Sequence, residues 1–99
     1  MVHTVAMAAT DRLPVFEFAV PCEVFGIDRS DLADPWYDLR MCAGEPGELR
    51  TTIGLRIDAP YGLDEITRAD TVVVPGCYRA SQLEPPPDLL DALREAHRN

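Results

Sequence analysis

Apolar residues recur along the chain in blocks whose spacing changes from strand-like to helical. Val2 to Ala8 is a short apolar run, typical of a buried first strand. From Leu13 to Gly26 the spacing becomes helical, with Pro14 suited to a first turn and Gly26 to the end. Two adjacent apolar stripes share this segment: Leu13, Phe16, Val20 and Val24 on one, and Phe18, Cys22 and Phe25 on the other. The pattern predicts a strand followed by a helix whose wide apolar face packs on a sheet.

Pro21 lies inside this predicted helix and has no N–H to donate to the carbonyl of Glu17. We therefore expect a kink or a short irregular turn. Two interpretations are open. The commoner outcome of a helix-breaking proline is that Pro21 starts a second helical piece. The alternative is that the break tilts Glu17 inward.

The middle of the chain returns to strand-like alternation. Trp36 to Ala43 predicts a second strand, in which Trp36 and Tyr37 are assigned to the core rather than to a dimer surface. Leu49 to Ile57 predicts one or two short strands broken at Gly54. Tyr61 to Arg68 has the pattern of a loop that carries one helical turn.

Thr71 to Val74 consists of four β-branched residues with no polar face, which is typical of a strand covered on both sides in a parallel sheet. Pro75 and Gly76 end it. After a polar loop, a last helix has an apolar stripe formed by Leu89, Leu90, Leu93 and Ala96. The order of strand, helix, strand, hairpin-like segment, strand and helix predicts an α/β fold. We expect the first half of a doubly wound, mostly parallel sheet with flavodoxin-like order.

The balance of charged residues limits the partners of the chain. Seventeen acidic residues face nine basic ones, all of them arginine and evenly spread, for a formal net charge of −8. Such a chain repels a phosphate backbone, so we expect no direct nucleic-acid contact. No apolar stretch is long enough to span a bilayer and no secretory signal opens the chain, so we expect no membrane contact and a cytoplasmic location.

Cysteine usage indicates free thiols. Cys22, Cys42 and Cys77 are widely spaced, with no CxxC pair and no nearby histidine. Neither a disulfide framework nor a zinc site is indicated, and we expect no metal and no cofactor. Cys22 and Cys42 lie on apolar stripes, where cysteine ordinarily acts as a small hydrophobe.

Two stretches together resemble a known family. The run Glu17 to Gly26 and the run Thr71 to Gly76 resemble the N-terminal half of the DJ-1/PfpI family, which has the class I glutamine amidotransferase-like fold. Within this family, the chain most resembles the sensor domain of AraC-type transcriptional regulators, in the strand Trp36 to Leu39 and the loop Asp58 to Tyr61. The resemblance implies that residues 1–99 are part of a three-layer sandwich, truncated before the nucleophile-elbow strand.

The carboxyl ends of parallel strands form the working crevice of such sheets, which directs attention to Gly76, Cys77 and Tyr78. In the family a glutamate of the first helix, matched here by Glu17, lies beside an elbow cysteine. The turn matched by Gly76 and Cys77 supplies an oxyanion hole, although many catalytic members have a second glycine in place of Cys77. The elbow cysteine, its following histidine and a helix-turn-helix would all lie after Asn99. We therefore expect Glu17, Gly76, Cys77 and Tyr78 as ligand-binding candidates and no catalytic residue.

Two of these candidates carry alternatives. Cys77 would need a base, a cation or a helix N-terminus to become a nucleophile, and His3 and His97 are poorly placed to help, so an unreactive or ligand-contacting thiol is favoured. By residue type Glu17 is more often exposed than buried, whereas the family match favours the crevice.

Three functions are consistent with these features. The first is a truncated, non-catalytic sensor domain of an AraC-type regulator that binds a small-molecule effector. The second is a remnant of a DJ-1/PfpI-type hydrolase or deglycase without its nucleophile. The third is a self-associating interaction module or a fragment without function of its own. In the third case the unpaired apolar edge of Thr71 to Val74 predicts self-association or poor folding of the isolated chain.

Overall fold

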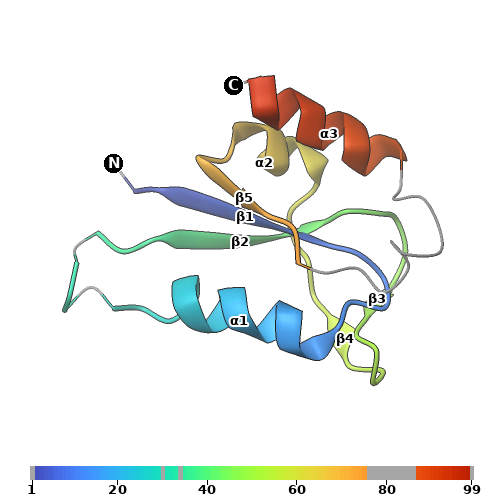
Figure 1. The fold of residues 1–99 in the computed structure, drawn as a ribbon, viewed down its shortest axis with the longest axis horizontal. Coiled ribbons are helices and arrows are strands. Elements are labelled where there is room, and N and C mark those ends of the chain that lie inside the picture. Colours follow the sequence, from blue (N-terminus) through green and yellow to red (C-terminus); the bar gives the residue numbers. More distant parts are fainter. Residues whose placement is uncertain (1, 30, 34, 76–86, 99) are drawn as a thin grey trace.

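A computed structural model describes residues 2–29, 31–33, 35–75 and 87–98 of the chain. At its centre is a parallel sheet of three strands: β1 (Thr4–Ala9), β2 (Asp38–Ala43) and β5 (Thr71–Val73). The order is β2-β1-β5, so β1 is the middle strand (Figure 1). The predicted α/β fold with a mostly parallel sheet is confirmed.

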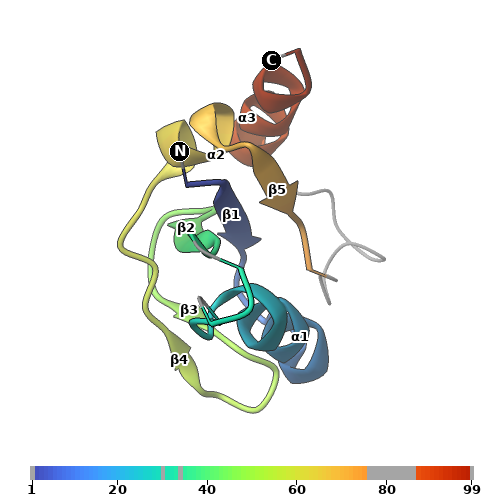
Figure 2. The ribbon, with the colours of Figure 1, turned by 90° about the vertical axis from the view of Figure 1, so that its left-hand side faces the viewer.

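Helices cover both faces of this sheet. On one face lies α1 (Val15–Phe25), together with a hairpin of β3 (Leu49–Arg50) and β4 (Arg56–Ile57). On the other lie α2 (Leu63–Arg68) and α3 (Pro87–Arg98), as Figure 2 shows end-on. The elements thus form three layers.

The side chains of β1 divide between two apolar cores, as the alternation of a strand requires. The core beneath α2 and α3 contains Ala6, Ala8, Cys42, Ile66, Leu89 and Ala92. The core on the other face contains Ala9, Leu13, Leu49 and Ile57, with Phe18 of α1 packed against them. Residues 5–9 are almost completely buried, so the middle strand is the one covered on both faces.

The segment after β2 folds back as a short antiparallel hairpin. Leu49 pairs with Ile57, and Arg50 with Arg56. The strands break at Gly54, whose φ of 88° is unfavourable for a residue with a Cβ. The prediction of one or two short strands broken at Gly54 is confirmed, with two strands observed.

The interior of α1 differs from both expectations for Pro21. The helix runs without interruption from Val15 to Phe25 with Pro21 buried inside it. Proline at this position leaves only the Glu17 carbonyl without its helical donor. Glu17 is an exposed residue of the first turn, and burial of the proline ring offsets part of the lost bond. Neither a second helical piece nor an inward tilt of Glu17 is observed.

The assignment of the apolar stripes of α1 was half wrong. Phe18 faces the sheet, as expected of its stripe, but Phe16, Val20 and Val24 of the other stripe are exposed, Phe16 to 79%. A single helix on one face of a narrow sheet buries only one side. Since both sides of α1 are apolar, one of them remains in contact with water.

Two strand predictions also need correction. Thr71 to Val74 does not form a covered central strand: β5 is an edge strand of the described sheet, with Thr71 and Val74 exposed. Trp36 and Tyr37 precede β2 and do not belong to the core. Their rings meet edge to face, and the Tyr37 ring also meets those of His3 and Phe25, leaving Tyr37 40% exposed.

Within the described residues, none of the helices combines the length and the apolar character that crossing a bilayer requires.

Candidate functional site

The loops that follow β1 and β2 meet at the carboxyl edge of the sheet. The Gly44 N–H donates to the Ala9 carbonyl at 2.7 Å, and the Asp11 N–H donates to the Glu45 carboxylate at 2.8 Å. A Cβ at Gly44 would lie 2.9 Å from the Ala9 oxygen. Only glycine permits this approach, which holds the two loops together.

The same β1 loop is tied to the hairpin. The N–H groups of Arg12 and Leu13 both donate to the Arg50 carbonyl, at 2.7 and 3.2 Å. In return, the Arg50 N–H donates to the Asp11 carboxylate at 3.0 Å, and the Thr52 N–H donates to the Leu13 carbonyl at 3.0 Å. Four hydrogen bonds therefore fix residues 11–13 against residues 50–52.

Arg12 has a backbone φ of 63°, in the left-handed region that residues with a Cβ rarely adopt. Such a conformation costs roughly 1–2 kcal/mol and persists only where surrounding bonds enforce it. Here the shared bonds to the Arg50 carbonyl enforce it, so the site keeps a fixed backbone at a strained residue.

A hollow of about 410 Å³ opens between this loop and the hairpin. It is lined by Asp11, Arg12, Arg50, Thr51, Thr52 and Gly54. Two other hollows lie elsewhere: one of about 350 Å³ beside His3, Trp36 and Tyr37, and one of about 440 Å³ along α3. Of these three, only the first lies at the carboxyl edge, where parallel α/β sheets place their ligands.

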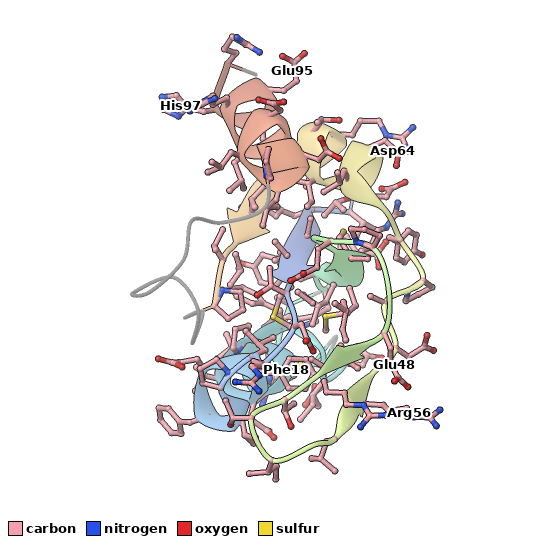
Figure 3. All side chains as sticks on the ribbon, turned by 90° about the vertical axis from the view of Figure 1, so that its right-hand side faces the viewer. Phe18, Glu48, Arg56, Asp64, Glu95 and His97 are labelled. Atoms are coloured by element: carbon pink, nitrogen blue, oxygen red, sulfur yellow. The ribbon has the colours of Figure 1, made fainter. Side chains whose placement is uncertain are left out.

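The arginines around this hollow differ in whether they have an acidic partner. Glu48 binds Arg50 at 2.9 Å and Arg56 at 3.0 Å, and the Glu48 and Arg56 side chains lie on the hairpin beneath the sheet (Figure 3). The other described arginines with an acidic partner are Arg29, Arg40, Arg68, Arg94 and Arg98. Among the described residues Arg12 is thus the one arginine without an ion pair, and it is one of the residues that line the hollow.

Neither described thiol is activated. Cys42 is buried on β2, and its Sγ donates to the Arg40 carbonyl at 3.6 Å. Burial, reinforced by the nearby Glu65 carboxylate, raises the pKa of Cys42 to about 11. Burial also raises the pKa of Cys22. Both groups remain protonated near neutral pH and are poor nucleophiles.

The chain superposes on an AraC family transcriptional regulator from Pseudomonas putida with a TM-score of 0.71 and 18% sequence identity, over 97% of this chain and 51% of that one. It superposes on a DJ-1 superfamily protein from Agrobacterium tumefaciens with a TM-score of 0.70 and 16% identity, over 98% and 49%. The fold is that of the DJ-1 superfamily.

A third structure with this DJ-1-like fold is a two-domain protein from Anabaena variabilis with DJ-1/ThiJ/PfpI-like and ferritin-like domains. Its TM-score is 0.69 and its identity 18%, over 97% of this chain and 27% of that one. No protein-family model and no curated protein matches the sequence. The chain spans about half the length, or less, of the structures it matches, and both a regulator and DJ-1 superfamily proteins share its fold.

Of the four predicted ligand-binding residues, the structure describes only Glu17. Glu17 lies in the first turn of α1, with its side chain exposed to solvent. Gly76, Cys77 and Tyr78 lie outside the described residues, so their place in the crevice stays a prediction. No group of three or more metal-binding side chains occurs in the described part of the chain.

Sequence reasoning missed the hollow and its arginine. By sequence, Arg12 is only one of nine evenly spread arginines, although it lies three residues after the end of β1. Its position just after the carboxyl end of a buried strand could have indicated a ligand contact, because ligand-binding loops begin there in parallel sheets. The pairing with Arg50 was not visible in the sequence.

Proposed function

We propose that this chain is the N-terminal half of a DJ-1-like sensor domain of the AraC type, that it binds a small-molecule effector, and that it has no catalytic activity. The observation that carries the proposal is the hollow at the carboxyl edge, bordered by an arginine with no ion pair. A cytoplasmic location is part of the same proposal, as is the absence of direct nucleic-acid contact by these residues.

Binding is favoured over catalysis by the chemistry of the edge. A DJ-1/PfpI-type hydrolase requires an activated thiol, and the pKa values of Cys22 and Cys42 are both raised. Neither cysteine lines the hollow. The polar groups that do line it are an aspartate, two arginines and two threonines, a set that orients a ligand through charge and hydrogen bonds.

Two assays on the 99-residue chain separate a sensor from a hydrolase. In a thermal-shift screen of small metabolites, we expect one or more compounds to raise the melting temperature saturably, because ligand binds the folded state alone. With a chromogenic ester, we expect turnover no faster than that of a Cys77→Ala variant. Ester turnover that depends on Cys77, with no stabilising compound in the screen, would contradict the sensor function and support the hydrolase.

We further propose that the isolated chain self-associates with a second copy of itself. The outer edge of β5 has no strand partner among the described residues, and the outer side of α1 exposes Phe16, Val20 and Val24. Unpaired strand edges and contiguous apolar surface both favour association. Sedimentation velocity tests this directly: a single monomeric species across the accessible concentration range would contradict it.

A further inference from the structure

The proposed function leaves the chemical class of the effector open, and the charges at the hollow narrow it. Resting on that function, we propose that the hollow beside Arg12 recognises a small monocarboxylate, which the Arg12 guanidinium binds with both of its outer N–H groups. The Thr52 hydroxyl supplies a further donor.

The acidic character of the chain makes the unpaired arginine informative. With 17 acidic and nine basic residues, carboxylates are abundant, and every other described arginine has one within 4.0 Å. Arg12 stays unpaired in this acidic chain because the neighbouring acids already bind other groups. An external carboxylate would supply the partner that the chain itself does not.

The acids on the segments bonded to the Arg12 loop are already engaged. The Asp11 carboxylate accepts the Arg50 N–H, and the Glu45 carboxylate accepts the Asp11 N–H. Glu48 bridges Arg50 and Arg56. The Asp11 bond holds the β1 loop against the hairpin, and the Glu45 bond holds it against the loop after β2, so neither acid can turn to Arg12 without loosening the site. Glu48 is occupied by two arginines within the hairpin.

The backbone of Arg12 is held in one conformation, which fixes the base of its side chain. The left-handed conformation of Arg12 and the two bonds from residues 12 and 13 to one carbonyl leave the backbone no freedom to carry the side chain away. Only side-chain rotamers remain to be ordered when a ligand binds, which lowers the entropy lost on binding.

Two features favour a carboxylate with a single charge. The planar fork of arginine matches the two oxygens of a carboxylate. Asp11 lines the same hollow and Glu48 neutralises Arg50, so the site has no surplus positive charge to offset a second negative charge on the ligand. Thr52 is exposed, and its hydroxyl is available to a ligand oxygen.

Titration of the ¹⁵N-labelled 99-residue chain with sodium propionate tests the proposal, with sodium chloride holding the ionic strength constant. The arginine Nε–H resonance assigned to residue 12 should shift saturably, with a Kd on the order of 1 mM for so small a probe. Arg12→Asn should weaken binding about tenfold or more, as expected for loss of a charge-assisted pair. Asparagine suits the left-handed backbone, so this variant preserves the fold.

Two further variants give the controls. Arg12→Lys should retain part of the affinity, because it keeps the charge without the fork. Arg94→Gln, which removes an ion-paired arginine on α3, should bind as the wild type does. An absence of saturable shifts, equal binding by Arg12→Asn, or tighter binding of inorganic phosphate than of propionate would each overturn the proposal.

These results are distinguishable from failure of the proposed function. If the thermal-shift screen yields only neutral or cationic ligands whose binding survives Arg12→Asn, the sensor function stands and the carboxylate inference fails. If ester turnover depends on Cys77, the non-catalytic function fails whatever the propionate titration shows.

Discussion

The close approach of β1 and β2 at Gly44 makes a quantitative prediction for Gly44→Ala. A Cβ placed there lies 2.9 Å from the Ala9 carbonyl oxygen and 3.2 Å from side-chain atoms of both Leu89 and Thr10. The first of these neighbours is backbone of the middle strand, so it cannot move aside as a flexible side chain would. The same backbone oxygen accepts the Gly44 N–H at 2.7 Å, which opposes any separation of the strands.

The expected cost follows from two opposing effects. Overpacking a tight site destabilises a protein by roughly 1–3 kcal/mol. Replacing glycine by alanine also restricts the unfolded chain, which stabilises by about 0.4–1 kcal/mol. The net loss in the free energy of unfolding is therefore about 1–2 kcal/mol, which lowers the melting temperature of a domain of this size by roughly 5–15 °C.

Circular dichroism during heating measures this, at one fixed protein concentration because association makes the melting temperature concentration-dependent. Gly62→Ala is the matched control. Its Cβ would meet only the Asp64 side chain, at 3.3 Å, and its φ of −109° suits alanine, so only the smaller loss expected at a helix N-cap remains and its melting temperature should fall less than that of Gly44→Ala. Equal melting temperatures for Gly44→Ala and Gly62→Ala would refute the proposed contact between the two loops.

Three more predictions concern stability, titration and association. Arg40→Gln removes bonds to Asp38 and to Glu65, which lies at 2.8 Å, and should lower the free energy of unfolding in urea denaturation by more than Arg94→Gln, which loses a single exposed ion pair. Because burial raises the Cys42 pKa from 9.0 to about 11, stability is full below pH 9 and falls as the pH rises toward 11. Cys42→Ser should flatten that part of the pH profile, and an unchanged slope would contradict the assignment. Phe16→Ser should reduce the sedimentation coefficient at high concentration while leaving unfolding within about 0.5 kcal/mol, since this ring is already 79% exposed; undiminished association would exclude α1 as the contact surface.

The order of elements was predictable because each has a strong local pattern. The β-branched and alternating runs gave β1, β2 and the hairpin break at Gly54, and the leucine stripe gave α3. These signals depend on neighbours a few residues apart, which the sequence displays directly.

Errors arose where the outcome depends on distant residues. Both sides of α1 are apolar, so periodicity alone did not decide whether Phe16 or Phe18 meets the sheet. The β-branched run of β5 indicated a covered strand, whereas full coverage needs a further neighbour that the described residues do not supply. Burial of a strand is a property of its surroundings as well as of its composition.

The candidate site illustrates the same limit. Arg12 differs from the other arginines only through bonds between segments far apart in sequence, namely those of Asp11 with Glu45 and Arg50. No local pattern indicates which arginine in an acidic chain will lack a partner. By contrast, the general location could be predicted. The order of strands and helices alone indicates that a ligand site lies at the carboxyl edge of the sheet, and the hollow is found at that edge.

The central claim, that ligand binds at this edge, is tested most directly by amide chemical-shift mapping of the strongest compound from the thermal-shift screen. The shifts should cluster at residues 11–13 and 50–54, which border the hollow. Shifts confined to Leu90, Leu93 and His97 on α3, or to His3, Trp36 and Tyr37 at the opposite edge, would contradict it.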